Sequence, residues 1–405
     1  MRPLRVVLVM VEPPVPFGNA AARWFYVLLK GLVERGHRVT AFAACGKAEE
    51  MDRARALFPA NAYDLRLYPF PERRGLRAKL ETARRPFSFM FGDALRRDLR
   101  ATLAQGFDVL HLEQLWSGWL GLDHVDRALV NVHYLFRIDQ EDRKPRSPRE
   151  ALDRFLAFGA EKRLVRRFRH VRAVSPRLES ALRAINPRAE VRSIPLGLDH
   201  SLYPYLPDDR RSAAATVTLI GSMEWSPSHS AAVRLLARLW PEIKRQVPEA
   251  RLEIAGWSAR ARLAEYLDWP DVSIAENVAE IAPYFERSSV FLYAPSRGSG
   301  MKIKIQEAMA FGVPVVTTSE GVEGLPAVDG VHAGVCEDDA GLIERTVALL
   351  RDPARQNRQR LAARRLLEEH CGPGPTLDAL EDLYATMTTA GPNQSHSLFH
   401  NVGDR

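Results

Sequence analysis

Short runs of valine, isoleucine and leucine alternate along this chain with amphipathic segments of helical length, and the alternation occurs in two rounds. Apolar runs of this kind are typical of parallel strands buried on both faces, and the segments between them of crossover helices. The first round predicts strands at residues 4–11, 39–43, 109–112, 129–132, 171–174 and 191–194, and the second at 217–220, 252–255, 272–275, 290–294 and 315–317. The pattern therefore predicts the α/β class, with two doubly wound sheets.

The predicted helices fit the same scheme. The helix after the first strand should span 20–35 and end at Gly36, because glycine readily adopts the left-handed conformation that ends helices. The second round predicts helices at 231–246, 261–267, 281–286, 303–310 and 342–350, and a last helix at 377–387.

A proline-rich stretch at 195–207, followed by polar residues, separates the two rounds and is typical of an interdomain linker. A chain of 405 residues also exceeds the size at which one core keeps growing. We predict an N-terminal domain at 1–200, a C-terminal domain at 201–375 and a helical segment at 376–390. The segment 391–405, rich in Pro, Asn, Ser, His and Gly, should be a flexible tail.

Composition narrows the class of protein. Hydrophobic residues make up 46% of the chain and charged residues 26%, as in globular proteins. No apolar run approaches the roughly 20 residues that span a bilayer. The three cysteines are far apart and form no disulfide or zinc pattern, so we expect a cytoplasmic protein. The net charge of +7, densest in the first half, favours anionic partners or peripheral contact with the inner membrane face, although a solvated arginine-rich surface explains it equally well.

Open α/β sheets bind ligands at the carboxyl ends of their strands, so the loops there are the candidate sites. After the first strand, Gly18 and Asn19 precede a helix and could cradle an anion or a sugar, although Asn19 could simply cap that helix. His133 ends a buried strand and is a candidate catalytic residue, whereas His111, in a similar place, is expected to be structural. In the second round Gly221 and Ser222 leave the first strand, where a glycine lets the chain turn over a phosphate.

The most informative loop is the glycine-rich turn before the helix at 303–310. It combines free backbone N–H groups, a favourable helix dipole and the cations of Lys302 and Lys304, which suits a diphosphate. Glu307 lies one turn further along the helix than Lys304, where its carboxylate could accept the two hydroxyls of a ribose. The alternative is an ordinary salt bridge on an exposed helix face.

These residues resemble the retaining GT-B glycosyltransferases of the family-4 type, also called glycosyl transferases group 1. The main carrier is KIQEAMAFGVPVV at 304–316, which is similar to the family's K-x-x-E-A-M-A-x-G-x-P-V-V block, followed by EGVEGL at 320–325. Supporting segments are FDVLH at 107–111, AVSP at 173–176, IPLGLD at 194–199, LIGSM at 219–223 and RLEIAG at 251–256. The resemblance implies a GT-B fold, in which two Rossmann-like domains face a central cleft and the final helix returns to the N-terminal domain.

The resemblance also implies roles for residues. Glu307 would bind the donor ribose, and Lys302 and Lys304, with the backbone amides of Gly300 and Met301, would hold the diphosphate. His133 would lie near the transferred sugar, and the backbone around Val278 would meet the base.

Several positions depart from the family pattern. Relatives often show consecutive glycines where this chain has Gly18, Asn19 and Ala20. Ser299 stands where many relatives carry a second glutamate, eight positions before Glu307. Ser222 and Ser228 stand where many relatives carry an arginine and a lysine. The chain instead resembles the subgroup with G-x-G-x-K-x-K, in which cations of the later loop would replace that pair.

The predicted function is transfer of a sugar from a nucleotide-diphosphate sugar to a hydroxyl acceptor. The lysines and the helix N-terminus could stabilise the leaving diphosphate, so we expect neither metal nor cofactor, and the resemblance implies retention at the anomeric carbon. The acceptor could be a saccharide, a lipid-linked saccharide or a small molecule. A degenerate member that binds a nucleotide sugar or a protein partner without turnover is the alternative.

Two further classes are disfavoured. A Rossmann oxidoreductase or epimerase would carry a G-x-G-x-x-G fingerprint after the first strand, and this chain has none there. A nucleic-acid binder would interleave aromatic residues with its basic patches, which this sequence lacks.

Overall fold

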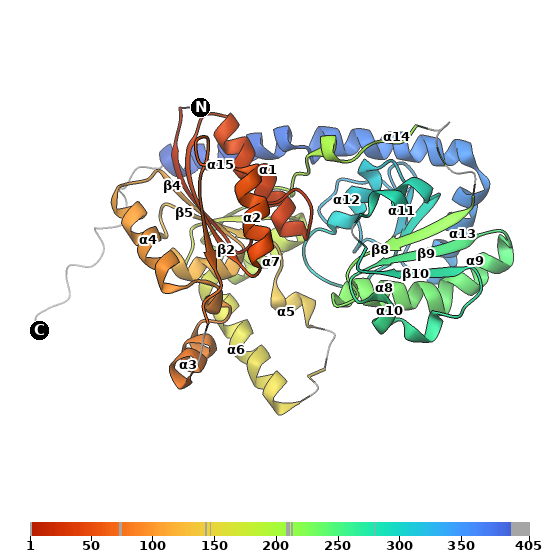
Figure 1. Cartoon of the computed structure of the whole chain (residues 1–405), viewed down its shortest axis with the longest axis horizontal. Coiled ribbons are helices and arrows are strands. Elements are labelled where there is room, and N and C mark those ends of the chain that lie inside the picture. Colours follow the sequence, from red (N-terminus) through yellow and green to blue (C-terminus); the bar gives the residue numbers. More distant parts are fainter. Residues whose placement is uncertain are drawn as a thin grey trace, which may run out of the picture.

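The structure of the chain is a computed structural model, and it describes residues 2–72, 75–141, 144–145, 147–207, 211, 214–278 and 280–389. The chain forms two parallel sheets with helices on both faces, one sheet in each half of the sequence (Figure 1). The predicted α/β class with two doubly wound sheets is confirmed. The predicted tail at 391–405 lies outside the described residues.

The first sheet has seven strands, and every neighbouring pair is parallel. In sheet order they are β3 (Asp64–Pro69), β2 (Arg38–Cys45), β1 (Arg5–Met10), β4 (Val109–Glu113), β5 (Ala128–Val132), β6 (His170–Ala173) and β7 (Glu190–Ser193). The chain order reverses between β1 and β4, so the carboxyl ends of these strands meet where ligands bind in such sheets. His133 follows β5 directly and lies at this edge.

The second sheet has six parallel strands. In sheet order they are β10 (Val272–Glu276), β9 (Arg251–Gly256), β8 (Thr216–Ile220), β11 (Val290–Tyr293), β12 (Val315–Thr317) and β13 (Gly334–Val335). Its order reverses between β8 and β11, and the glycine-rich turn, defined as residues 297–302, leaves β11 at that point. The two switch points are therefore the positions from which the candidate residues project.

Helices cover both sheets (Figure 1). Those of the first half are α1 (Ala20–Glu34), α2 (Ala48–Leu57), α3 (Leu76–Arg84), α4 (Asp93–Ala104), α5 (Phe136–Asp139), α6 (Pro148–Val165) and α7 (Pro176–Ile185). Those of the second half are α8 (Ser226–Arg234), α9 (Trp240–Gln246), α10 (Ala259–Arg262), α11 (Ala282–Arg287), α12 (Ile303–Ala310), α13 (Asp339–Arg351), α14 (Pro353–His370) and α15 (Pro373–Thr389). Helix α1 ends as predicted before Gly36, whose φ is 86°.

The predicted helix at 231–246 begins earlier, at Ser226, and passes through a π-helical stretch at Leu235–Leu239 before α9. The predicted helix at 261–267 is wrong in extent. A short α10 and a 3₁₀ turn, Ala264–Tyr266, take its place.

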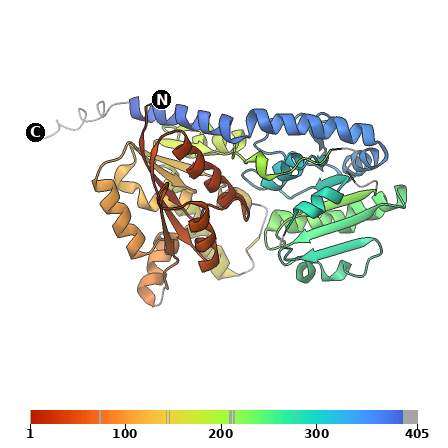
Figure 2. The same cartoon turned by 45° about the horizontal axis from the view of Figure 1, so that its top comes forward.

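Helix α15 packs against α1 and β4 of the first sheet, although it follows the whole second sheet in sequence. Figure 2 shows α14 and α15 running one after the other along one side of both halves. Arg35 donates to the carboxylates of Asp378 (2.6 Å) and Glu381 (2.5 Å), and Tyr384 Oη lies 2.5 Å from His111 Nδ1. The last helix is thus part of the N-terminal core. Within the described residues, none of the helices is both long and apolar enough to span a membrane.

Candidate active site

The glycine-rich turn contacts the N-terminal half at the loop after β5. Gly300 has φ of 79°, and a Cβ on it would overlap the carbonyl oxygen of His133. Only glycine combines this left-handed backbone with so close an approach. The turn and His133 are therefore brought together from opposite halves of the chain.

Lys302 and Lys304 stand at the start of α12, where Lys302 is buried and Lys304 is half-buried in spite of their charge. Lys302 Nζ donates to the carbonyl oxygen of Gly300 (2.8 Å). Lys304 Nζ donates to Ser228 Oγ and lies 4.7 Å from the centroid of the Tyr293 ring. Burial lowers the pKa of both ammonium groups, and for Lys304 the value falls to about 7. No described carboxylate forms an ion pair with either lysine, so an incoming anion would supply the missing counter-charge.

Gly221 gives Lys304 its space. A Cβ at Gly221 would lie 2.5 Å from Lys304 Nζ and 3.0 Å from Ser228 Oγ. The loop after β8 and the start of α12 therefore meet around one ammonium group. Ser228 accepts the hydrogen bond of that group.

Glu307 is buried and pairs with Arg23 of α1, not with Lys304. Both side chains are shielded from solvent, with exposed fractions of 7% and 11%. The alternative of a salt bridge on an exposed helix face is therefore wrong. Arg23 was not among the predicted residues, because a lone arginine in the first helix gives no signal of a partner in the other half of the sequence.

His133 lies beside a cluster of buried polar groups centred on Glu113. The Glu113 carboxylate accepts hydrogen bonds from Trp24 Nε1 (2.8 Å) and Asn131 Nδ2 (2.5 Å) and lies 2.8 Å from His133 Nε2 and 3.1 Å from His111 Nε2. Burial alone would raise the pKa of Glu113, but the two histidines outweigh it and hold the pKa well below its usual value. Glu113 is thus an ionised carboxylate that fixes the orientation of the His133 ring.

The sequence carries a signal for Glu113, which was not among the predicted residues. A glutamate between buried leucines at the end of a central strand is costly unless partners neutralise it. His111 is structural, as expected, because both of its ring nitrogens face Glu113 and Tyr384.

Asn19 accepts from the backbone N–H of Ala22 (3.0 Å) and so caps α1, and it also donates to Glu12. Gly18, just before it, has φ of 134°. Both contacts stay inside the N-terminal half. The capping interpretation describes what Asn19 does here, and a role for Gly18 and Asn19 in binding remains a prediction.

The other predicted residues lie around the second sheet. The backbone oxygen of Ser222 accepts from Trp225 N–H (3.2 Å) as the chain enters α8. Met301 Sδ lies 3.1 Å from the backbone nitrogen of Leu196 in the proline-rich linker. Val278 follows β10 and packs on the apolar core. None of these contacts tests a role in binding.

Ser299 and Asp139 form a second link between the halves that the sequence did not reveal. Asp139 Oδ1 accepts from Ser299 N–H (2.5 Å) and from Ser299 Oγ (2.7 Å). Nearby, Arg177 of α7 donates to Glu320 and to the carbonyl oxygen of Gly298, so further charged groups tie the turn to the first sheet.

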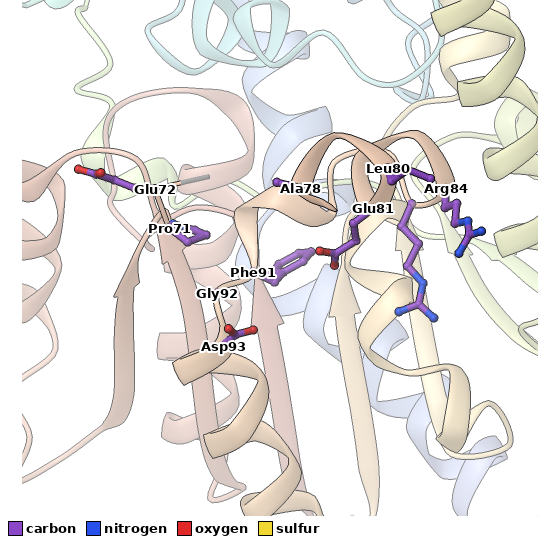
Figure 3. A pocket seen from close by; sticks show the side chains of 10 residues that line it. Pro71, Glu72, Ala78, Leu80, Glu81, Arg84, Phe91, Gly92 and Asp93 are labelled. Carbon is purple, nitrogen blue, oxygen red and sulfur yellow. The ribbon is translucent and has the colours of Figure 1, made fainter. Parts of the chain in front are cut away.

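Two hollows lie on the N-terminal half around α3. One, of about 890 Å³, lies between α3 and α6 and has an aromatic lining that includes Phe87, Phe89 and Phe136. The other, of about 830 Å³, lies between α3 and the start of α4 (Figure 3). In it Phe91 and Glu81 lie close together under α3, while Arg84 points away. No predicted site residue lines either hollow, but Phe136 is three residues beyond His133.

Two family models match consecutive parts of the chain. Glycosyltransferase Family 4 matches residues 21–202, and Glycosyl transferases group 1 matches residues 214–352. An uncharacterized glycosyltransferase of Haemophilus influenzae is 32% identical over 97 residues, a segment that spans 22% of this chain and 27% of that protein.

Solved structures share the fold over almost the whole chain. Sucrose-phosphate synthase from Thermosynechococcus elongatus superposes with a TM-score of 0.71 at 17% identity, covering 96% of this chain and all of that one. The Anabaena protein HepE, in complex with UDP and glucose, gives 0.67 at 13% identity, covering 94% of this chain and all of that one. WaaG, a glycosyltransferase involved in lipopolysaccharide biosynthesis, gives 0.63 at 13% identity, covering 93% and 99%.

The two parallel sheets, the residues at their switch points and the two family models define one class. The chain belongs to the GT-B glycosyltransferases. This is the class that the sequence predicted.

Proposed function

We propose that this protein transfers a sugar from a nucleotide-diphosphate sugar to a hydroxyl acceptor. One observation carries the proposal: the N-terminus of α12 presents two lysines that form no ion pair with a carboxylate among the described residues, and the turn that leads into it contacts the backbone of His133 in the other half. Cations of this kind suit a diphosphate. The structure of HepE with UDP and glucose, which has the same fold, supports a nucleotide-sugar donor.

The chemistry follows from charge. When the bond between the anomeric carbon and the diphosphate breaks, negative charge develops on the leaving oxygen. Lys302, Lys304 and the backbone N–H groups of the turn are already in place to stabilise that charge, so we propose that transfer needs no metal. Retention at the anomeric carbon is proposed from the resemblance to the family-4 enzymes.

Glu307 is proposed to bind the ribose. Its carboxylate pairs with Arg23, and that pair would have to separate for two hydroxyls to take the place of the guanidinium. Donor binding should therefore be sensitive to both residues, in opposite directions. Loss of Glu307 removes the acceptor of the hydroxyls, whereas loss of Arg23 removes their competitor.

The acceptor is proposed to bind the N-terminal half. The hollow between α3 and α6 shares Phe136 with the loop that carries His133. Its lining combines three phenyl rings, which suit an apolar chain, with charged residues such as Lys79 and Arg149, which suit a polar headgroup. Of the possible acceptors, this lining favours a lipid-linked saccharide.

A donor screen tests the proposal. Thermal shift and slow donor hydrolysis would be measured with UDP-, GDP-, ADP- and dTDP-sugars. One donor should stabilise the wild type and be hydrolysed by it. Glu307→Ala and Lys304→Ala should each weaken binding by about tenfold or more, since each removes a hydrogen bond to a charged group.

Glu344→Ala and Lys162→Ala serve as matched controls, because both residues are exposed on helices away from the turn. They should leave binding and hydrolysis unchanged. Binding of a donor without turnover, even with acceptor present, would favour the degenerate binding protein. If no donor binds, or if binding survives both substitutions in the site, the proposal is wrong.

A further inference from the structure

The loop after β5 delivers a carboxylate from the N-terminal half to the glycine-rich turn of the C-terminal half. Asp139 ends α5, six residues after His133, and its Oδ1 accepts both the N–H and the hydroxyl of Ser299. The same hydroxyl accepts from the N–H of Leu135 (2.8 Å). The loop and the turn are thus held in one relative position.

Helix α5 is fixed from behind. Glu161 of α6 accepts from the N–H of Phe136 (2.6 Å) and from that of Arg137 (3.4 Å), which satisfies the free donors at the start of the short helix. Burial raises the pKa of Glu161 to about 7, partly offset by these two hydrogen bonds. The position of Asp139 therefore does not depend on Ser299 alone.

Within the described part of the chain, hydrogen bonds reach one oxygen of Asp139. Oδ1 takes both bonds from Ser299, whereas Oδ2 accepts no hydrogen bond from any residue that the structure describes. The residue is half-buried, and Oδ2 is not among the unpaired oxygens that are fully shielded from solvent. Burial raises the pKa of Asp139, while the bonds from Ser299 and the charges of Lys302 and Arg177 lower it.

The location of this free oxygen indicates what it could bind. Asp139 contacts the glycine-rich turn, which leads to Lys302 and Lys304, the residues proposed to hold the diphosphate. It also belongs to the loop that begins at His133, which is proposed to lie near the sugar. The part of a donor that lies between the two lysines and His133 would be its sugar, which carries hydroxyl groups. Carboxylates accept hydrogen bonds from hydroxyls at roughly twice the strength of neutral acceptors.

We infer that Asp139, supplied by the N-terminal half, binds hydroxyls of the donor's sugar. This inference rests on the proposed function and names a further residue of its site. A carboxylate at position 299 would lie against Asp139, so a negative charge there would compete with the one at position 139.

The test separates the sugar from the nucleotide. Binding of UDP and of UDP-glucose, or of the corresponding pair for the base that the donor screen selects, would be measured by calorimetry on the full chain. Asp139→Asn should weaken binding of the nucleotide sugar about tenfold or more and that of the nucleoside diphosphate less than about twofold.

Glu141→Gln is the matched control. Glu141 lies two residues further on and forms an exposed ion pair with Arg297 of the same turn (3.3 Å), so the substitution removes another contact between the same two segments. It should change neither affinity. If Asp139→Asn weakens both ligands equally, Asp139 only holds the turn and the inference is wrong. If the wild type binds neither ligand, the proposed function fails as well.

Moving the carboxylate from position 139 to position 299 gives a second test, which measures recovery of affinity as well as its loss. Ser299→Asp should weaken nucleotide-sugar binding, because two carboxylates would share one position. The double variant Asp139→Ser with Ser299→Asp restores a single carboxylate and should recover at least part of the lost affinity for the sugar. A double variant as weak as the sum of the two single ones would overturn the inference.

Discussion

Lys304 determines how the affinity for a nucleoside diphosphate depends on pH. Because burial lowers its pKa to about 7, most of its ammonium group is deprotonated at pH 8. A bound diphosphate favours the charged form, so binding takes up a proton between pH 7 and the usual lysine value of about 10.4. Affinity for a nucleoside diphosphate should therefore fall as pH rises through this window, by up to about tenfold per pH unit.

Calorimetry in two buffers of different ionisation enthalpy would measure that proton uptake. Lys304→Gln should reduce the uptake and flatten the pH dependence, whereas Lys162→Gln should change neither. The stability of the empty protein should move the opposite way. Its unfolded state binds more protons between pH 7 and 10, so the free energy of unfolding contributed by Lys304 rises with pH. An affinity that is independent of pH would contradict the assignment.

At the residue scale, the sequence predicted one side of each contact and missed the other. Lys302, Lys304, Glu307 and His133 all occupy the expected elements, because motifs and strand ends are local signals. Arg23 and Asp139 were missed, because each contacts a residue in the other half, Glu307 of α12 and Ser299 of the turn, and its own neighbours in sequence carry no trace of that contact.

The glycine-rich turn is the element on which both halves meet, and Gly300 is its most constrained position. Gly300→Ala should lower the free energy of unfolding by about 1–3 kcal/mol, because alanine is strained at a φ of 79° and its methyl group would overlap the carbonyl oxygen of His133. It should also weaken nucleotide binding, since the turn would move.

Chemical denaturation and calorimetry measure the two effects. Gly159→Ala is the control, because an added Cβ in the middle of α6 meets nothing within 4 Å and alanine favours a helix by about 1 kcal/mol. That variant should be as stable as the wild type or more so. Equal stability of Gly300→Ala and wild type would show that the turn can adjust.

Helices and strands with strong apolar runs were predicted well, and several elements that lack such runs were missed. Helix α12 spans the predicted 303–310, and all eleven predicted strands are present. Strand β3 was missed because it alternates polar with half-buried residues at a sheet edge, and β13 because it has two residues. Helix α14 was missed because polar and charged residues, arginine above all, make up 11 of its 18 residues, so its apolar stripe is narrow.

At the scale of the whole molecule, α15 joins the end of the chain to the first sheet. A chain that ends at residue 372 should lose protection from hydrogen exchange in α1 and β4, because α15 covers both and Leu377 packs against Gly31. Strands β8–β12 should keep their protection. A chain that ends at residue 389 is the control and should match the full protein. Uniform loss of protection in both halves would contradict this division.

The arrangement of two doubly wound sheets could be predicted from sequence, since each sheet is encoded by its own consecutive strands. The contacts between the halves could not, because they depend on single polar side chains such as Arg177, whose choice of partner is set only once both sheets have folded.

The return of α15 also has a consequence for synthesis of the protein. The ribosome releases the first sheet early, but the helix that covers α1 and β4 is made only after the whole second sheet. Until α15 is made, the apolar surface beneath it has no cover. The core of the nascent N-terminal half therefore stays incomplete while the second half is translated. The N-terminal half is therefore synthesised before the C-terminal half but completes its core after it.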